Sequence, residues 1–242
     1  GAFPVHTTDK SPRTGPAAPP VPLPQTLLAL AAATFVAAHW ATGLQDVWAR
    51  GMLTFDTLWY HGPFAARIAD AGSVWGMHFT DPLYLNWFYP QVSELLHGTG
   101  ILLFGNDFLS PLINLGWLGL ALFAGWCIGR PYGTGATAMA AVASVMDADL
   151  LFSRQPGNAN NDVAAIALFL CSVAVLVNTR WSRSGVLPSG ALLVGGLAAG
   201  LALGTKLTVV PPVLALTAGV IFLVVAGLAV LEGTDIWLRG EI

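Results

Sequence analysis

Charged residues are scarce in this sequence. Only 10% of its 242 residues are Asp, Glu, Lys or Arg, whereas a typical soluble domain contains about 25%. Hydrophobic residues make up 55% of the chain, and the mean hydropathy is +0.67. Disordered chains need high charge, and collagen or coiled coils need a strict repeat, so these classes are excluded. The formal net charge of -3 gives no reason to expect nucleic acid as a partner.

Cysteine and the common catalytic motifs are also nearly absent. The two cysteines, Cys127 and Cys171, lie inside apolar stretches and show no CxxC or Cys/His spacing. We therefore expect small buried side chains rather than a disulfide framework. The sequence contains no GxxxxGK[ST], HExxH or GxSxG pattern, so it gives no signal for a P-loop, a zinc protease or a serine hydrolase.

Long apolar runs are what the sequence does contain. Each is close to the ~20 residues with which a helix crosses a bilayer, and each is too continuously apolar for a barrel strand. The sequence therefore predicts an all-α, polytopic transmembrane helical bundle of about six spans. These spans are residues 25–44, 108–129, 133–152, 163–179, 187–205 and 207–231.

Basic residues indicate the orientation and the domain organisation. Residues 1–24 contain seven prolines and are expected to form a flexible tail, residues 25–231 the transmembrane core, and residues 232–242 a C-terminal segment. If the chain crosses six times, most basic residues fall on one side, so the positive-inside rule places both termini in the cytoplasm. These residues are Lys10, Arg13, Arg130, Arg180, Arg183 and Arg239.

The first loop, residues 45–107, faces outward in this topology and is the only long connection. It is rich in Trp, Tyr and Phe, which prefer the headgroup layer of a membrane. Its stretch from Thr57 to Ala71 is amphipathic and is expected to form a helix in the interface plane. The aromatic residues form either a purely structural belt or a belt that also frames a site.

Polar side chains gather on the predicted outer side, where they are able to converge on one cavity. Ionisable groups at the ends of spans are costly, which favours a functional role. The members are Asp56, Tyr60, His61, His78, Asp81, Asp147, Asp149, Arg154, Gln155, Asn158, Asn160, Asn161, Asp162 and Lys206.

Asp56 is the best candidate for a general base. It lies between Phe55 and the aromatic pair Trp59 and Tyr60, and partly apolar surroundings raise the proton affinity of a carboxylate. His61 then orients Asp56 or binds a phosphate. The alternative is that Asp56 simply caps the following helix.

Lys206 is the best candidate for binding a phosphate, because it is a lone cation between two apolar spans. Such a lysine needs an anion, a carboxylate partner or a path by which it snorkels to water. Arg154 poses the same choice. Asn161 and Asp162 open the fourth span, either as helix caps or as polar contacts to sugar hydroxyls. They are too weak a signature to indicate a metal, and no cofactor is expected.

Taken together, these segments resemble the GT-C superfamily of membrane glycosyltransferases that use polyprenyl-phosphate sugars, in particular bacterial relatives of the family-39 mannosyltransferases. The resemblance covers about residues 25–225. It is carried by residues 55–67 (FDTLWYHGPFAAR), 87–90 (WFYP), 155–162 (QPGNANND) and 200–208 (GLALGTKLT).

The resemblance implies a function on the extracytoplasmic side of a bacterial plasma (inner) membrane. The acidic residue near the start of the first outward loop, here Asp56, is the catalytic base of that family. The sugar passes from the lipid phosphate to an acceptor hydroxyl, usually with inversion. The residues then expected to bind the substrate are Tyr60, His61, Arg154, Asn161, Asp162 and Lys206. The lipid-linked donor and the membrane lipids are the partners that follow.

Two alternatives remain open at this point. Enzymes of the superfamily have more spans, so the chain is expected to correspond to an N-terminal core, or to a shortened relative that is a non-catalytic, accessory subunit of a larger membrane complex. A transporter or channel is the second alternative, but it would place polar groups at the membrane midplane, whereas here they sit at the ends of spans.

Overall fold

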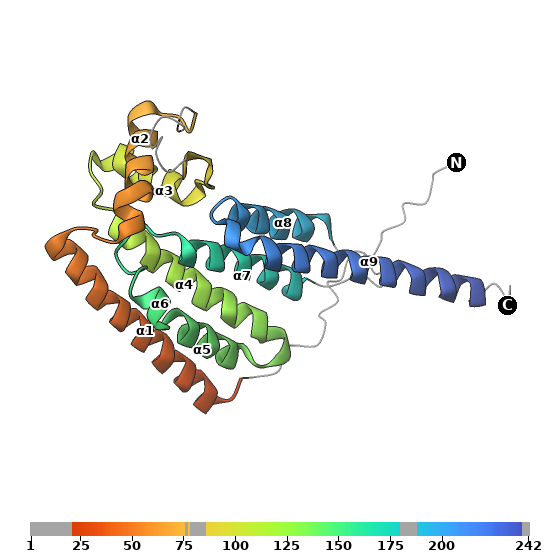
Figure 1. Ribbon diagram of the computed structural model, residues 1–242. Helices are drawn as coiled ribbons and strands as arrows, with labels where there is room; N and C mark the ends of the chain where they lie inside the picture. The colour runs from red at the N-terminus through yellow and green to blue at the C-terminus, as the bar shows by residue number, and fades with distance from the viewer. Residues whose placement is uncertain (1–20, 76, 78–85, 180–187, 239–242) are drawn as a thin grey trace, which may run out of the picture.

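A computed structural model describes residues 21–75, 77, 86–179 and 188–238. This part of the chain is all-α and contains nine α-helices, which confirms the expected all-α class. The Pro-rich tail as far as residue 20, and Arg180, Arg183, His78 and Asp81, lie outside the described residues. Figure 1 shows long helices side by side, with α2 and α3 at one end of them and α9 extending away.

The first helix is longer than the sequence suggested. α1 (Leu23–Arg50) continues six residues past the expected end of the first span at Leu44. Pro22 precedes it, and it ends where Gly51 adopts a φ of 88°, which favours glycine. The exposed pair of Arg50 and Asp46, one turn apart, supports the extra turns.

Helices also occupy the expected outward loop. After Gly51 the chain forms a short π-helical segment, η1 (Thr57–His61), which runs directly into α2 (Gly62–Ala71). The short η3 (Asn86–Phe88) precedes α3 (Val92–Phe104), and α3 packs against α2. The predicted helix from Thr57 to Ala71 is therefore present, as η1 and α2.

The bundle itself is built by α4 (Ser110–Gly129), α5 (Gly135–Met146), α7 (Asp162–Asn178) and α8 (Ser189–Leu203). α4 packs between α5 and α7, α1 lies on α5, and α8 lies on α7 (Figure 1). One buried core joins α1, α4, α5 and α7, and its members include Trp40, Leu118, Met146 and Val163. The short turns η4 (Arg130–Tyr132) and η5 (Leu207–Val209) connect α4 to α5 and α8 to α9 (Val210–Leu238).

The third apolar segment, predicted as one span over residues 133–152, is broken. α5 ends at Met146, Ala148 is extended with a ψ of 139°, and α6 (Asp149–Phe152) follows. Partners from α1 stabilise the break. Trp40 Nε1 donates to the Met146 carbonyl at 3.1 Å, and His39 Nδ1 lies 2.7 Å from Asp147 Oδ1.

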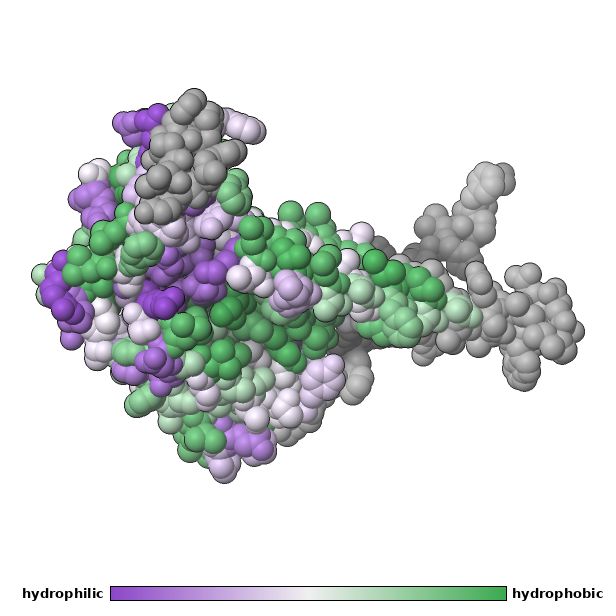
Figure 2. All heavy atoms as spheres, in the orientation of Figure 1, coloured by the Kyte–Doolittle hydropathy of each residue, from purple (hydrophilic) through white to green (hydrophobic). Residues whose placement is uncertain are grey.

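Three of the helical segments are long and apolar enough to cross a membrane: Leu23–Arg50, Ser110–Tyr132 and Leu207–Ala226. The helices of the other three predicted spans, α5, α7 and α8, have 12, 17 and 15 residues. Figure 2 shows apolar residues over the face of α9 and α8, and hydrophilic residues gathered where the long helices meet α2 and α3.

Candidate functional site

A buried loop, residues 153–161, joins α6 to α7 and forms the centre of the site. All of its residues from Gln155 to Asn161 are buried, so its backbone polar groups need partners inside the protein. Asn114 of α4 supplies them. Its Nδ2 lies 2.9, 2.9 and 2.8 Å from the carbonyl oxygens of Gln155, Asn158 and Asn160. A single fully buried amide thereby holds the shape of the loop.

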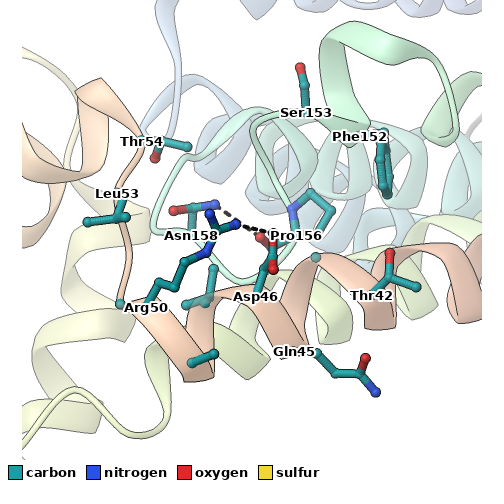
Figure 3. Close-up of a pocket in the computed structure, with 14 residues that line it drawn as sticks. Thr42, Gln45, Asp46, Arg50, Leu53, Thr54, Phe152, Ser153, Pro156 and Asn158 are labelled. Atoms are coloured by element: carbon teal, nitrogen blue, oxygen red, sulfur yellow. Dashed lines mark hydrogen bonds and ion pairs between the residues drawn. The ribbon is translucent and has the colours of Figure 1, made fainter.

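Two cavities open beside this loop. The first, which we call the α1 groove, has a volume of about 820 Å³ (Figure 3). It is lined by residues of α1 between Thr42 and Arg50, by Leu53 and Thr54, and by Phe152, Ser153, Pro156 and Asn158. The second, the Lys206 cavity, has a volume of about 270 Å³. It is lined by Tyr60, Tyr89, Pro90, Asn161 and residues 205–208.

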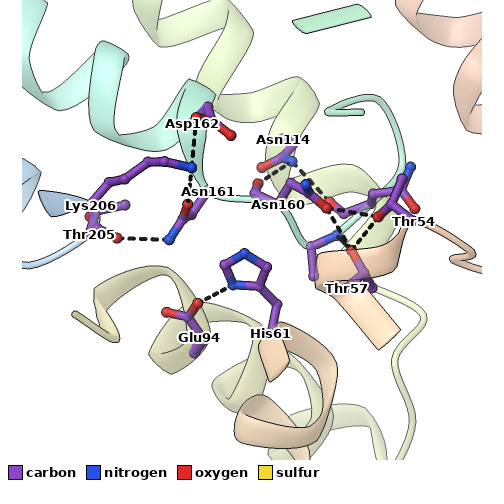
Figure 4. A network of polar contacts seen from close by, with 12 residues as sticks. Thr54, Thr57, His61, Glu94, Asn114, Asn160, Asn161, Asp162, Thr205 and Lys206 are labelled. Carbon is purple, nitrogen blue, oxygen red and sulfur yellow. Dashed lines mark hydrogen bonds and ion pairs between the residues drawn. The ribbon is translucent and has the colours of Figure 1, made fainter. Parts of the chain in front are cut away.

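The start of η1 is tied to the same loop. Thr57 Oγ1 donates to Asn160 Oδ1 at 2.9 Å and accepts a hydrogen bond from the Ala159 backbone N at 3.0 Å. Thr54 Oγ1 lies 2.8 Å from the Asn160 oxygen as well. The segment between α1 and α2, which contains Asp56 and Tyr60, is therefore held against the buried loop through Thr54 and Thr57 (Figure 4).

Lys206 is held by the start of α7. Its Nζ lies 2.7 Å from Asp162 Oδ1 and donates to Asn161 Oδ1 at 3.3 Å (Figure 4). Asn161 Nδ2 donates to the Thr205 carbonyl at 2.7 Å, and Gln155 Nε2 donates to Asp162 Oδ2 at 2.8 Å. Since an ammonium group has three N–H donors, these two contacts leave one donor for an oxygen of a ligand in the cavity.

Two tyrosines also line the Lys206 cavity. The rings of Tyr60 and Tyr89 meet edge to face, with centroids 5.6 Å apart. Burial raises the pKa of the Tyr60 hydroxyl well above its usual range, and the charges of Asp56, Glu94 and Asp162 raise it further. The Tyr60 hydroxyl is therefore a neutral donor at physiological pH, and three carboxylates act on it.

A buried ionisable cluster lies beneath Tyr60. His61 Nδ1 forms a short contact with Glu94 Oε1, and both side chains are only 1% exposed (Figure 4). The His61 ring also packs against Tyr60 with centroids 4.0 Å apart. His97 is equally buried, and desolvation together with the charge of His61 lowers its pKa to about 4. Within the described residues, Glu94 Oε2 and both His97 ring nitrogens have no hydrogen-bond partner.

The structure brings most of the predicted site residues to one place. Tyr60, Asn161 and Lys206 line the cavity; Asp162 binds Lys206 and His61 lies beneath Tyr60. Two predicted residues line neither cavity. Arg154 is exposed and lines neither cavity. Asp56 is half-buried at the start of η1, and it does not line the Lys206 cavity.

Sequence reasoning missed Glu94, His97 and Asn114. Glu94 and His97 lie three residues apart in α3, so they share one face of an otherwise apolar helix, and that spacing was a usable signal. Asn114 is a single amide in a 20-residue apolar helix, which is a signal of the same kind. In the part of the chain that the structure describes, no three His, Cys, Asp or Glu side chains are grouped so that they could hold a metal ion.

The chain was compared with known protein families, with curated proteins and with solved structures, and none of them matches it.

Proposed function

We propose that this chain is a membrane glycosyltransferase, or the core of one, that transfers a sugar from a polyprenyl phosphate to an acceptor hydroxyl. One observation carries the proposal. The cation Lys206, two tyrosines and the amide of Asn161 meet at a single cavity, at one end of helices long enough to cross a membrane. A cation beside aromatic rings suits a ligand that combines a phosphate with a sugar ring.

Each residue has a role in this reaction. The free N–H of Lys206 donates to the phosphate of the donor and stabilises the negative charge that this group gains as it leaves. Tyr60 and Tyr89 contact the sugar. Asp56 accepts the proton of the acceptor hydroxyl, whose oxygen attacks the anomeric carbon from the face opposite the phosphate. The bond from that carbon to the phosphate oxygen breaks, and the sugar is transferred with inversion.

The same proposal includes the membrane topology. Six segments cross the plasma membrane of a bacterium, both termini are cytoplasmic, and η1, α2 and α3 lie on the outer face. The donor enters from the lipid, which allows its isoprenoid chain to stay among the exposed apolar side chains of α8 and α9. Leu193, Leu197, Leu214 and Phe222 are examples of these side chains.

A sugar-transfer assay tests the enzyme. The full chain is reconstituted in lipid vesicles with radiolabelled mannosyl, glucosyl or arabinosyl polyprenyl phosphate, and an octyl glycoside is supplied as acceptor. We expect Asp56→Asn to lower the transfer rate by about 100-fold or more, the usual contribution of a general base. Asp70→Asn is the matched control, because Asp70 is an exposed carboxylate of α2 whose contact is with Arg67. Equal rates for Asp56→Asn and the wild type would remove Asp56 from the mechanism.

A non-catalytic, accessory subunit on the same scaffold is the second candidate. The observation that favours it is the position of Asp56, which lies outside the residues that line the Lys206 cavity. In this case the exposed apolar faces of the long helices contact other membrane subunits. No transfer from any of the three donors by the intact, folded chain would favour this candidate.

A further inference from the structure

In the sequence, Asp56 lies between residues that line the α1 groove and residues that line the Lys206 cavity. Thr54 lines the groove and Tyr60 lines the cavity, and Asp56 stands between them in sequence. The buried loop has the same arrangement, since Pro156 and Asn158 face the groove and Asn161 faces the cavity. Two separate binding spaces therefore meet the segment that carries the proposed base.

The groove has the size and the lining of a ligand site. About 820 Å³ is within the usual range of roughly 300–1,000 Å³ for small-molecule sites. Figure 3 shows the polar ends of Thr42, Asp46, Arg50, Thr54 and Asn158 around the groove. These groups include guanidinium donors, carboxylate acceptors, and hydroxyls and amides that act as both.

The charges in the groove favour a neutral ligand. Arg50 and Asp46 form an ion pair across one turn of α1, and both side chains remain about two-thirds exposed, at 64% and 66%. The pair has no net charge, unlike an isolated cation, so it does not favour a phosphate. A guanidinium and a carboxylate side by side instead match neighbouring hydroxyl groups, because one donates to a hydroxyl oxygen and the other accepts from a hydroxyl proton.

The groove also has a fixed aromatic wall. Phe152 lines it, and its ring is stacked on His39 with centroids 3.5 Å apart and an angle of 18° between the planes. His39 is in turn held by Asp147 at 2.7 Å. The apolar face of a sugar ring packs on such a wall while its hydroxyls reach polar groups. The break between α5 and α6 thus has a consequence for binding, since it positions Asp147 and Phe152.

We propose that the α1 groove binds a carbohydrate, and that this carbohydrate is the acceptor in the transfer reaction. The acceptor role rests on the proposed function, whereas carbohydrate binding by the groove does not. Hydroxyl-rich, uncharged and partly apolar ligands are the class that the Arg50–Asp46 pair and Phe152 fit together. The acceptor hydroxyl then approaches Asp56 from the groove and the donor sugar from the Lys206 cavity.

Saturation-transfer NMR on the full chain in nanodiscs tests whether the α1 groove binds a carbohydrate. The probes are mannotriose, maltotriose and xylotriose, and sugar-based detergents are removed because they would compete. We expect a signal from at least one trisaccharide, and we expect Arg50→Ala and Asp46→Ala to weaken its binding by about 10-fold, the usual effect of losing a hydrogen bond to a charged group. Arg67→Ala is the matched control, since Arg67 forms a similar exposed pair with Asp70 on α2.

The outcomes separate the two proposals. If none of the trisaccharides binds, or if the groove variants bind them as the wild type does, the groove is not a carbohydrate site. If a threonine-containing tripeptide binds the groove and the sugars do not, the ligand is a peptide and the proposal is overturned. In the transfer assay, Arg50→Ala is expected to raise the KM for the octyl glycoside, whereas the control Arg67→Ala leaves this KM unchanged. Sugar binding without any transfer would refute the enzyme and keep the carbohydrate site.

Discussion

Lys206 shows how a single side chain satisfies several requirements at once. A lysine between two apolar segments needs an anion, a carboxylate or a path to water. The structure supplies the carboxylate of Asp162 at 2.7 Å and leaves the lysine side chain 25% exposed at the cavity. The pair holds the turn between α8 and α9 on the start of α7. The same cation is therefore structural, and it remains open to a ligand.

His97 leads to a prediction about pH and stability. Burial and the charge of His61 lower its pKa in the folded protein from 6.5 to about 4. Between these values the unfolded chain binds a proton that the folded protein does not bind, so stability falls as the pH falls through this window. From pH 7.5 to pH 5 we expect a loss of about 2 kcal/mol from this residue, since one pKa unit corresponds to about 1.4 kcal/mol.

His97→Gln removes this proton-binding group and tests the prediction. The measurement is the change in the midpoint of thermal unfolding between pH 7.5 and pH 5, in nanodiscs, for both proteins. The comparison uses this change rather than absolute stability, because the variant itself alters a buried position. An unchanged pH dependence in His97→Gln would show that His97 is protonated in the folded state.

The sequence predicted the candidate site where charge stands out against apolar surroundings. Lys206, Asp162 and Tyr60 were found in this way, and the fold brings them together. The position of Arg154 could not be predicted, because its direction depends on how the buried loop is held by Asn114 of a different helix. Glu94 and His97 were missed because their burial depends on how α3 packs against α2, which is not apparent from local sequence.

At the scale of helices, the close approach of α2 and α3 depends on Gly98. A Cβ added at this position would lie 2.9 Å from the Ala65 carbonyl oxygen and 3.3 Å from the Ile68 side chain. Backbone cannot move aside as a flexible side chain does, so the two helices would have to separate. His61 directly precedes α2 and contacts Glu94 of α3, so this contact depends on the same packing of the two helices. The glycine therefore positions the buried pair.

We predict that Gly98→Ala destabilises the protein by about 1–3 kcal/mol, the usual cost of overpacking, and increases hydrogen exchange in α2 and α3. Gly116→Ala is the matched control. It is a helical glycine with no atom within 4 Å of an added Cβ, so it should be neutral or stabilise the helix by up to about 1 kcal/mol. Equal effects of the two substitutions would mean that the helices are not in close contact at Gly98.

The helices were largely predictable from apolar runs, whereas their ends were not. The all-α class followed from the length and hydropathy of the runs, and within the described residues each predicted run contains an α-helix, the third one broken into α5 and α6. The break at Asp147 and Ala148 was missed because its cause is distant in sequence: Trp40 and His39 of α1 bind the two sides of the break. Local sequence carries little information about such partners.

At the scale of the molecule, apolar surface and polar groups are separated along the bundle. Only 11% of the most apolar part of the segment Leu207–Ala226 is buried, and only 22% of the most apolar part of Leu23–Arg50. Such exposed apolar helices need lipid or other apolar partners. Lys206, the buried loop and the His61–Glu94 pair lie close together (Figure 4), and hydrophilic residues gather where the long helices meet α2 and α3 (Figure 2). This arrangement suits a site at a membrane surface, reached from lipid on one side and from water on the other.

In the predicted six-span topology, the end of the bundle that carries α2 and the end that carries the turn after α4 face opposite sides of the membrane. Cysteine labelling tests this topology. Cys127 and Cys171 are first replaced by Ser. Single cysteines are then introduced by Ala71→Cys, at the exposed end of α2, and by Tyr132→Cys, in the exposed turn after α4. In intact cells, a membrane-impermeant maleimide is expected to label Ala71→Cys. It should label Tyr132→Cys only after the plasma membrane is permeabilised, because residues 108–129 lie between the two sites as a span.

The labelling pattern distinguishes the possible arrangements. Labelling of both cysteines in intact cells would mean that Ser110–Tyr132 does not cross the membrane, although it is long and apolar enough to do so. Protection of Ala71→Cys together with labelling of Tyr132→Cys would invert the topology and place the Lys206 cavity in the cytoplasm. A polyprenyl-phosphate donor in the outer leaflet would then be out of reach, so this outcome would refute the proposed reaction as well as the topology.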